Sequence, residues 1–247
     1  MKKIGYVRSD FSSKFGIPRQ SGLVHTEAKI FFLPPYNNPD AVRGLEEFSH
    51  IWVIWEFSEN LRSNQGWSPT VRPPRLGGNL RKGVFATRSP FRPNPIGLSC
   101  VRLLEIIREK EGPVLLIEGG DMLDGTPVYD IKPYIPYADS VPEASGGFAD
   151  EAYNYSLAVR IPEHLRERIP KKKQTEIEEL LAQDPRPSYQ EDPGRQYGMT
   201  YGEMEIKFVV KEGLATVTEV EKRNFAAGDD RQSRKKNLQD IPVKKGV

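Results

Sequence analysis

Short, largely apolar runs recur between residues 3 and 134, separated by turn residues, and this pattern predicts β-strands. The runs are rich in β-branched and aromatic residues, and they lie at 3–9, 28–33, 49–57, 82–87, 99–107, 114–118 and 128–134. Clusters of proline, asparagine and glycine separate them as turns. One short helix is expected at 40–47, with Asp40 as its N-cap. Because many short strands follow one another with few helices between them, we predict a mainly β fold built on a closed or nearly closed barrel.

The pattern changes at 140–150, where small, polar and glycine residues indicate a linker. Beyond it, residues 170–183 have the spacing of an amphipathic helix, with Ile177, Leu180 and Leu181 on one face. This is the one clear helical pattern of the chain, and it opens a second unit.

Apolar and polar residues alternate at 204–219 on either side of a Glu212–Gly213 turn, which predicts a hairpin. We therefore expect an N-terminal β-barrel over 1–145 and a small C-terminal α+β domain over 150–222. Residues 223–247 have little to bury, so we expect a disordered basic tail.

Several classes of protein are excluded by what the sequence lacks. The longest apolar run is far shorter than the ~20 residues that cross a bilayer, and the N-terminus lacks a signal peptide, so we expect a cytoplasmic protein that does not enter a membrane. A single cysteine, Cys100, rules out an internal disulfide, and a buried structural thiol is the favoured interpretation. The three histidines are scattered and no zinc spacing occurs, so no metal is expected. No dinucleotide fingerprint, P-loop or nucleophile elbow is present.

The charge distribution is uneven, although the formal net charge is only +2. Between Asn60 and Leu104 there is no aspartate or glutamate, and the basic residues there are Arg62, Arg72, Arg75, Arg81, Lys82, Arg88, Arg92 and Arg102. Prolines make much of this block a rigid loop. Such a block creates a local positive field that attracts anions, although a solvated basic loop is the simpler alternative.

Three segments have the composition of binding loops. The segment 16–24 combines a rigid proline with an arginine and an amide, and the segment 86–98 is the proline- and arginine-rich part of the basic block. The segment 121–132 contains an Asp-Gly-Thr turn, which between strands is usually only a turn. Beside an arginine-rich loop, however, an acidic turn can bind a ligand that has both cationic and anionic parts.

Together these segments resemble the TsaA-like family. The motifs that carry the resemblance run in the same order from about Ile4 to Ser140, and they continue at Leu181–Tyr189: IPRQSGLV, AVRGLEEFSHIWV, TVRPPRLGG, GVFATRSPFRPNPIGLS, DGTPVYDIKPYIPYADS and LAQDPRPSY. The resemblance implies an S-adenosyl-L-methionine-dependent tRNA methyltransferase, homodimeric, with a β-barrel in place of a Rossmann fold. It also implies the reaction: transfer of a methyl group to N6 of N6-threonylcarbamoyladenosine at position 37, just 3′ of the anticodon, in threonine tRNA.

The resemblance also implies the residues of the cofactor site. They are Pro18, Arg19, Gln20, Arg88, Leu98 and the turn of Asp124, Gly125, Thr126 and Pro127. Relatives often carry a His-Gln pair after the tryptophan-containing strand, where this chain has Ser58 and Glu59, and Glu59 can instead face a ribose hydroxyl. Arg186 and Tyr189 are candidates to reach the partner's pocket.

These residues suit different chemical groups of the cofactor and the substrate. The cofactor sulfonium is cationic, so a carboxylate such as Asp124, an aromatic face such as Phe91 or backbone carbonyls suit it better than an arginine. Arginines suit the cofactor carboxylate, the threonyl carboxylate and phosphates. No general base is evident, so Arg88 and Asp124 are predicted to contribute to catalysis through positioning and electrostatics. The alternative is a non-catalytic RNA-binding barrel that uses the basic block only for phosphates.

Overall fold

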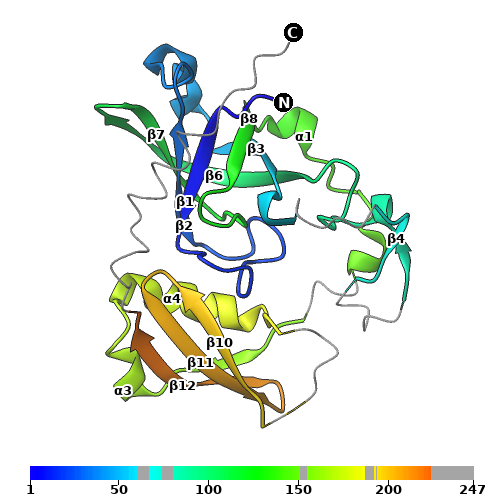
Figure 1. Ribbon diagram of the computed structural model, residues 1–247, viewed down its shortest axis with the longest axis vertical. Coiled ribbons are helices and arrows are strands. Elements are labelled where there is room, and N and C mark those ends of the chain that lie inside the picture. The colour runs from blue at the N-terminus through cyan, green and yellow to red at the C-terminus, as the bar shows by residue number, and fades with distance from the viewer. Residues whose placement is uncertain (61–66, 74–79, 151–154, 187–191, 193, 224–247) are drawn as a thin grey trace.

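The structure is a computed structural model that describes residues 1–60, 67–73, 80–150, 155–186, 192 and 194–223. It contains a barrel and a smaller sheet with two helices, stacked one on the other (Figure 1). Three residues of the sequence predictions, Arg62, Arg75 and Tyr189, lie outside the described residues, as does the predicted tail beyond Arg223.

Six strands close the barrel and confirm the predicted mainly β fold. In their order around the barrel they are β1 (Gly5–Ser9), β2 (Glu27–Phe32), β7 (Gly112–Glu118), β6 (Ile96–Glu109), β3 (His50–Glu56) and β8 (Pro127–Pro133). Every neighbouring pair is antiparallel, and β8 closes the ring against β1. The short helix α1 (Pro136–Asp139) follows β8.

Alternation along the strands fills the barrel with side chains. In β3 the side chains of Ile51, Val53 and Trp55 are buried while their neighbours are half-buried, as the two-residue period of a strand predicts. Burying each aliphatic side chain of this kind contributes about 1.5–3 kcal/mol. The Trp55 ring lies directly on Gly97 of β6, where an added Cβ would come within 2.2 Å of the ring. Because glycine has no side chain, the Trp55 indole can pack directly against the β6 backbone at position 97.

Two local predictions in the barrel were wrong. The segment 40–47 is not one helix but two single turns, Pro39–Val42 and Leu45–Glu47, because Gly44 between them has a φ of 84°. The first turn is capped by Asn38, whose side chain accepts a hydrogen bond from the backbone of Asp40 at 2.9 Å.

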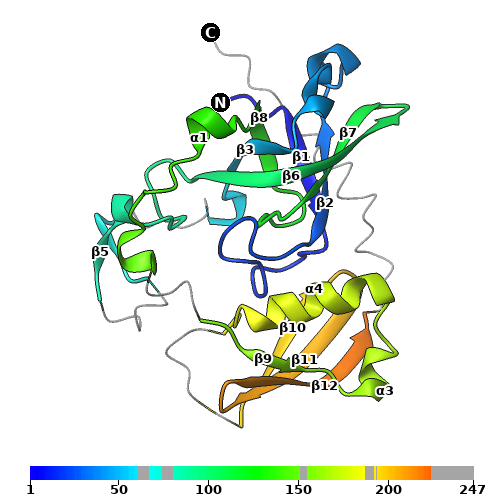
Figure 2. The same cartoon turned by 180° about the vertical axis from the view of Figure 1, so that it is seen from behind.

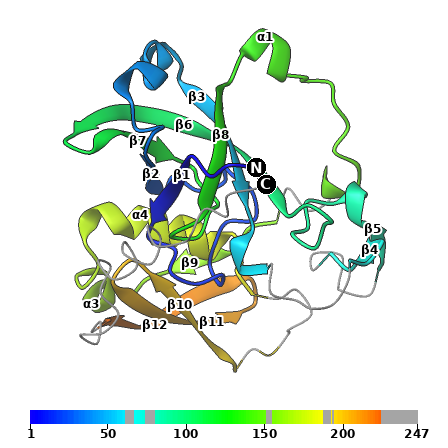
Figure 3. The same cartoon turned by 45° about the horizontal axis from the view of Figure 1, so that its top comes forward.

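The predicted strand at 82–87 is reduced to β5 (Lys82–Gly83), which pairs with β4 (Thr70–Val71) and runs into a turn at Val84–Ala86. This two-stranded ribbon stands to the side of the barrel as an arm (Figure 3).

The second unit, residues 155–223, is a four-stranded sheet in the order β10, β11, β12, β9. Its elements are β9 (Ala158–Arg160), α3 (Glu163–Arg166), α4 (Lys171–Ala182), β10 (Gln196–Tyr201), β11 (Met204–Lys211) and β12 (Leu214–Lys222). The predicted hairpin is β11–β12, whose turn places Glu212 and Gly213 at positive φ. The predicted helix is α4, which buries Ile177, Leu180 and Leu181 and lies between the sheet and the barrel (Figure 2).

A loop of the barrel is built into the core of the second unit. Residues 10–26 connect β1 to β2, and within them Phe11 and Val24 are buried in the same cluster as the apolar residues of α4 and the second sheet. Gly16, at a φ of 94°, lies so close to Met199 that an added Cβ would come within 2.6 Å of its side chain. The β1–β2 loop of the barrel is therefore part of the apolar core of the second unit, while the barrel strands enclose a core of their own.

Candidate functional site

The structure brings together two of the predicted cofactor residues that are 68 positions apart, Gln20 and Arg88. Gln20 comes from the β1–β2 loop, and Arg88 follows the Val84–Ala86 turn. The Arg88 guanidinium donates a hydrogen bond to the side-chain oxygen of Gln20, and the Arg88 side chain is otherwise exposed. An arginine fixed by an amide and open to solvent is suited to binding an anionic group of a ligand.

A carboxylate that the sequence predictions passed over, Asp121, lies beside this pair. It accepts a hydrogen bond from Ser99 Oγ at 2.5 Å and another from the backbone N–H of Ser21. Ser99, fully buried in β6, in turn accepts a bond from Trp55 Nε1 at 2.8 Å. Asp121 therefore ties the Gln20 loop to β3 and β6.

Charge and burial act in opposite directions on Asp121. Burial raises the pKa of its carboxyl above the usual range, while the Ser99 hydrogen bond and the nearby Arg88 charge lower it in part. Functional sites often contain a carboxyl group whose pKa is raised by burial and lowered by a nearby cation. The signal in the sequence was its position directly after an apolar strand and the Gly119–Gly120 pair.

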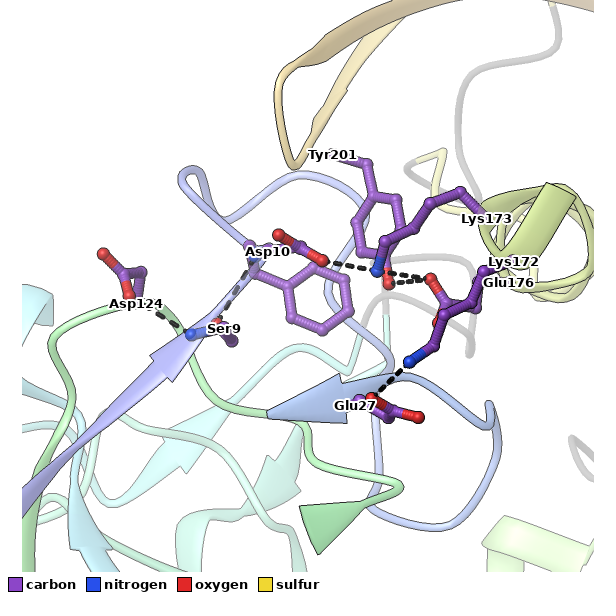
Figure 4. A network of polar contacts seen from close by, with 9 residues as sticks. Ser9, Asp10, Glu27, Asp124, Lys172, Lys173, Glu176 and Tyr201 are labelled. Atoms are coloured by element: carbon purple, nitrogen blue, oxygen red, sulfur yellow. Dashed lines mark hydrogen bonds and ion pairs between the residues drawn. The ribbon is translucent and has the colours of Figure 1, made fainter. Parts of the chain in front are cut away.

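The predicted acidic turn is held to β1 by both its backbone and its carboxylate. Asp124 accepts a hydrogen bond from Arg8 Nη1 at 2.9 Å. It accepts another from the backbone N–H of Ser9 at 3.2 Å (Figure 4). The backbone N–H of Gly125 donates to the carbonyl of Val7 at 2.8 Å. The Arg8 partner offsets the charge that Asp124 can offer to a sulfonium. The Arg88 charge acts on Asp121, whereas the basic partner of Asp124 is Arg8.

Neighbouring side chains of the predicted binding segment 16–24 contact different parts of the molecule. Pro18 is buried, and the Arg19 guanidinium donates to the backbone carbonyls of Asp184 and Arg186 at 3.1 and 3.3 Å. Arg186 also pairs with the Asp184 carboxylate at 2.8 Å. The side chain of Arg19 therefore contacts the second unit, whereas that of Gln20 contacts Arg88.

Of the remaining predicted residues, Thr126 is buried, whereas Leu98, Ser58 and Glu59 are partly or largely exposed. Leu98 is 57% exposed on β6, and Ser58 and Glu59 form a single turn directly after β3. Lys14, from the β1–β2 loop, donates to the backbone carbonyl of Glu59 at 3.3 Å. Cys100 is half-buried on β6, and burial, with the Asp139 charge second, raises the pKa of its thiol, so it stays protonated at neutral pH.

The arm presents aromatic and cationic side chains together. Trp67 and Phe85, both more than half exposed, have ring centroids 6.2 Å apart, and the Arg92 guanidinium lies 5.7 Å from the Phe85 ring. Arg72 and Arg81 are exposed on the same arm. Aromatic faces beside cations suit unstacked bases and phosphates of RNA.

No helix within the described part of the chain has the length and apolar character needed to span a bilayer. The same residues bring together no group of three histidine, cysteine or acidic side chains that could hold a metal ion.

Comparison with known proteins identifies relatives along almost the whole chain. The tRNA (adenine(37)-N6)-methyltransferase of Escherichia coli (strain K12) is 43% identical over 231 residues, which cover 90% of this chain and 97% of the relative. A protein of Pseudomonas aeruginosa named putative S-adenosylmethionine-dependent methyltransferase RcsF is 44% identical over 211 residues, covering 82% of this chain and 89% of that protein.

A crystal structure of TrmO from P. aeruginosa superimposes with a TM-score of 0.72 at 38% identity and covers 89% of this chain and 95% of that one. The family model for the tRNA-methyltransferase O N-terminal domain matches residues 6–140, and the model for the TrmO C-terminal domain matches residues 154–223. With both parts of the family matched in order, the chain belongs to the tRNA-methyltransferase O (TrmO) family.

Proposed function

We propose that the chain methylates N6 of N6-threonylcarbamoyladenosine at position 37 of threonine tRNA. The coarser activity follows from the family: the chain is a tRNA (adenine(37)-N6)-methyltransferase that depends on S-adenosylmethionine. Enzymatic relatives also remove the support for a non-catalytic RNA-binding barrel. The threonylcarbamoyl group and the threonine isoacceptor are the parts that we add.

The observation that carries the site is the contact between Arg88 and Gln20 beside the half-buried Asp121. The proposed set of residues fits S-adenosylmethionine, because it combines the exposed guanidinium of Arg88 with the exposed apolar side chain of Leu98. When bound, the cofactor supplies an electrophilic methyl group. Arg88 would bind a carboxylate of the cofactor or of the substrate, and Leu98 would pack against the adenine ring.

The other predicted cofactor residues remain part of this proposal, and we assign their contacts from the positions of their side chains. We infer that Pro18 and the backbone of Arg19 shape the pocket, since the Arg19 guanidinium is bonded to the second unit. Glu59, beside Ser58, would face a ribose hydroxyl. The turn from Asp124 to Pro127 would close the site through its backbone, and the Asp124 charge would act together with Arg8.

Substrate selection follows from charge. The threonyl group adds a carboxylate to the base, and an arginine that pairs with it would favour the modified over the unmodified adenine. A site built for a charged partner rejects analogues that lack it by ~10⁴-fold or more in good cases. The exposed arginines of the arm, Arg72 and Arg81, would bind tRNA phosphates, which makes affinity dependent on salt.

Two further proposals concern the setting of the enzyme. We propose a homodimer, supported by exposed apolar side chains at the start of β6 and in the loop before it: Phe91 and Ile96. Light scattering at several concentrations tests it. We also propose a cytoplasmic location, where tRNA is modified.

The test begins with the nucleosides of tRNA. Purified protein with S-adenosylmethionine and threonine tRNA should add one methyl group to threonylcarbamoyladenosine, detected by mass spectrometry, and a gene deletion should remove that methyl group. Arg88→Ala should abolish turnover while leaving the melting temperature unchanged, because the side chain is exposed. Arg108→Ala, exposed on the same β6 strand, is the control. An unchanged nucleoside profile in the deletion strain would refute the proposal.

A further inference from the structure

The β1–β2 loop that carries Pro18 and Gln20 is enclosed by the second unit at several points along its length. The rings of Phe11 and Tyr201 lie 5.4 Å apart, and those of Phe15 and Phe208 lie 6.4 Å apart. Phe11 retains only 3% of its exposure. Without the second unit these apolar side chains would face water, so the loop depends on that unit for its conformation.

A charged network fixes the start of this loop to α4 and β10. Lys173 Nζ lies 2.5 Å from Asp10 Oδ2 and 2.7 Å from Glu176 Oε2 (Figure 4). Tyr201 Oη donates to the same Glu176 carboxylate at 2.7 Å. The Lys173 and Glu176 side chains are only 21% and 7% exposed. Burial tends to lower the pKa of Lys173, but the hydrogen bonds to the two carboxylates outweigh it and raise that pKa.

Asp10 connects this network to the predicted site. Its backbone carbonyl accepts from the N–H of Gly202 at 2.8 Å, and its neighbour Ser9 donates a backbone hydrogen bond to Asp124 at 3.2 Å. Ser9 Oγ also donates to the backbone carbonyl of Met122 at 2.9 Å. The adjacent residues Ser9 and Asp10 therefore join the acidic turn of the barrel, through Ser9, to α4 and the β10–β11 turn, through Asp10.

We propose that Lys173 is a positioning residue of the methyltransferase: through Asp10 it sets the β1–β2 loop, and with it the Gln20–Arg88 contact at the cofactor site. The inference rests on the proposed cofactor site. It gives the second unit a role in cofactor binding, although Lys173 itself bonds to Asp10 and Glu176 rather than to the predicted cofactor residues.

The neighbouring residue on the same helix offers a matched control. Lys172 Nζ pairs with Glu27 Oε2 at 2.7 Å and so also joins α4 to the barrel, but the Lys172 side chain is 64% exposed and Glu27 begins β2, beyond the loop. Exposed ion pairs contribute little. If any link between the units were sufficient, loss of either lysine would have the same effect.

The experiment compares Lys173→Met, Lys173→Arg and Lys172→Met in the full-length chain. Lys173→Met should weaken S-adenosylmethionine about 10-fold by isothermal titration calorimetry, the effect of losing a partly buried charge-assisted contact. It should raise KM for the cofactor more than it lowers kcat, with KM for tRNA little changed. Lys173→Arg, which keeps the charge, should restore most of the affinity, and Lys172→Met should bind like the wild type.

Three outcomes would overturn the inference: wild-type cofactor affinity in folded Lys173→Met, an equal loss in Lys172→Met, or no recovery in Lys173→Arg. If Lys173→Met does not fold, Asp10→Asn tests the same contact from the loop side, and wild-type affinity there would also overturn it. Wild-type protein that neither binds the cofactor nor methylates tRNA would instead contradict the proposed function itself.

Discussion

Replacing Asp121 with asparagine separates the charge of the carboxylate from its hydrogen bonds. The amide oxygen can still accept from Ser99 Oγ, which lies 2.5 Å from the carboxylate, and from the backbone N–H of Ser21. The negative charge beside Arg88 is lost. We expect Asp121→Asn to impair methyl transfer while leaving the barrel folded.

The magnitude follows from the kind of bond. Hydrogen bonds to charged groups contribute about 1.5–3 kcal/mol and neutral ones about 0.5–1.5 kcal/mol, so neutralising Asp121 weakens the support of Gln20 and Arg88 by about 1–2 kcal/mol. Since about 1.4 kcal/mol corresponds to tenfold, kcat/KM should fall about 10-fold. Burial raises the pKa of this carboxyl in the folded state, so the charge itself opposes folding at neutral pH. The variant should therefore melt at the same temperature as the wild type or higher.

The pH dependence has a defined sign. A carboxyl with a raised folded-state pKa makes the wild type gain stability as pH falls through that pKa toward the ordinary value of about 3.9. Asp121→Asn should lose this gain, measured by melting temperature from pH 8 to pH 4. Asp130→Asn, exposed on β8, is the control. Wild-type kcat/KM at pH 7, or a fall of more than about 4 °C in melting temperature, would refute the reasoning.

Two other predictions concern stability. Gly97→Ala places a methyl group 2.2 Å from the Trp55 ring, and such overpacking costs about 1–3 kcal/mol. Its melting temperature should therefore be several degrees lower than that of the wild type. Gly83→Ala, which has open space around the added Cβ, is the control and should melt like the wild type. At Asp184 burial raises the pKa but the Arg186 hydrogen bonds and charge outweigh it, so the pKa is lowered. The resulting stability is present above about pH 3.9 and is lost as pH falls through the folded-state pKa. The melting temperature of Asp184→Asn should therefore fall less steeply than that of the wild type as the pH is lowered below about 4. An equally steep fall in both proteins would contradict the reasoning.

The barrel could be predicted because each strand carries its own signal. In β3 and β11, buried and half-buried positions alternate without a break, and in β12 the alternation holds over Leu214–Val217 before the register shifts. The helix α4 was equally readable from its apolar face. In these elements local spacing and tertiary burial agree, so the pattern along the chain contains the answer.

Elements whose form is decided by distant contacts were not predictable. The strand predicted at 82–87 is only two residues long and pairs with Thr70–Val71. The helix predicted at 40–47 is divided into two turns at Gly44.

The site shows the same limit. The Asp-Gly-Thr motif drew attention to Asp124, but the carboxylate beside Arg88 is Asp121, which reaches that position only through the folding of β6 and the β1–β2 loop. Nothing in the local sequence of the β1–β2 loop, residues 10–26, shows that Phe15 and Ile17 pack against the apolar core of the second unit.

The burial of the β1–β2 loop has a consequence for how the chain can be divided. A protein cut within 140–150 would separate the two units in sequence but would leave Phe11 and Val24, now 3% and 1% exposed, without their covering layer. At about 25 cal/mol per Å² of apolar surface, exposing several such side chains costs several kcal/mol, a large part of the stability of a typical domain. The two units should therefore melt in one cooperative transition, and a barrel expressed alone should expose an aggregation-prone apolar loop next to the proposed cofactor site.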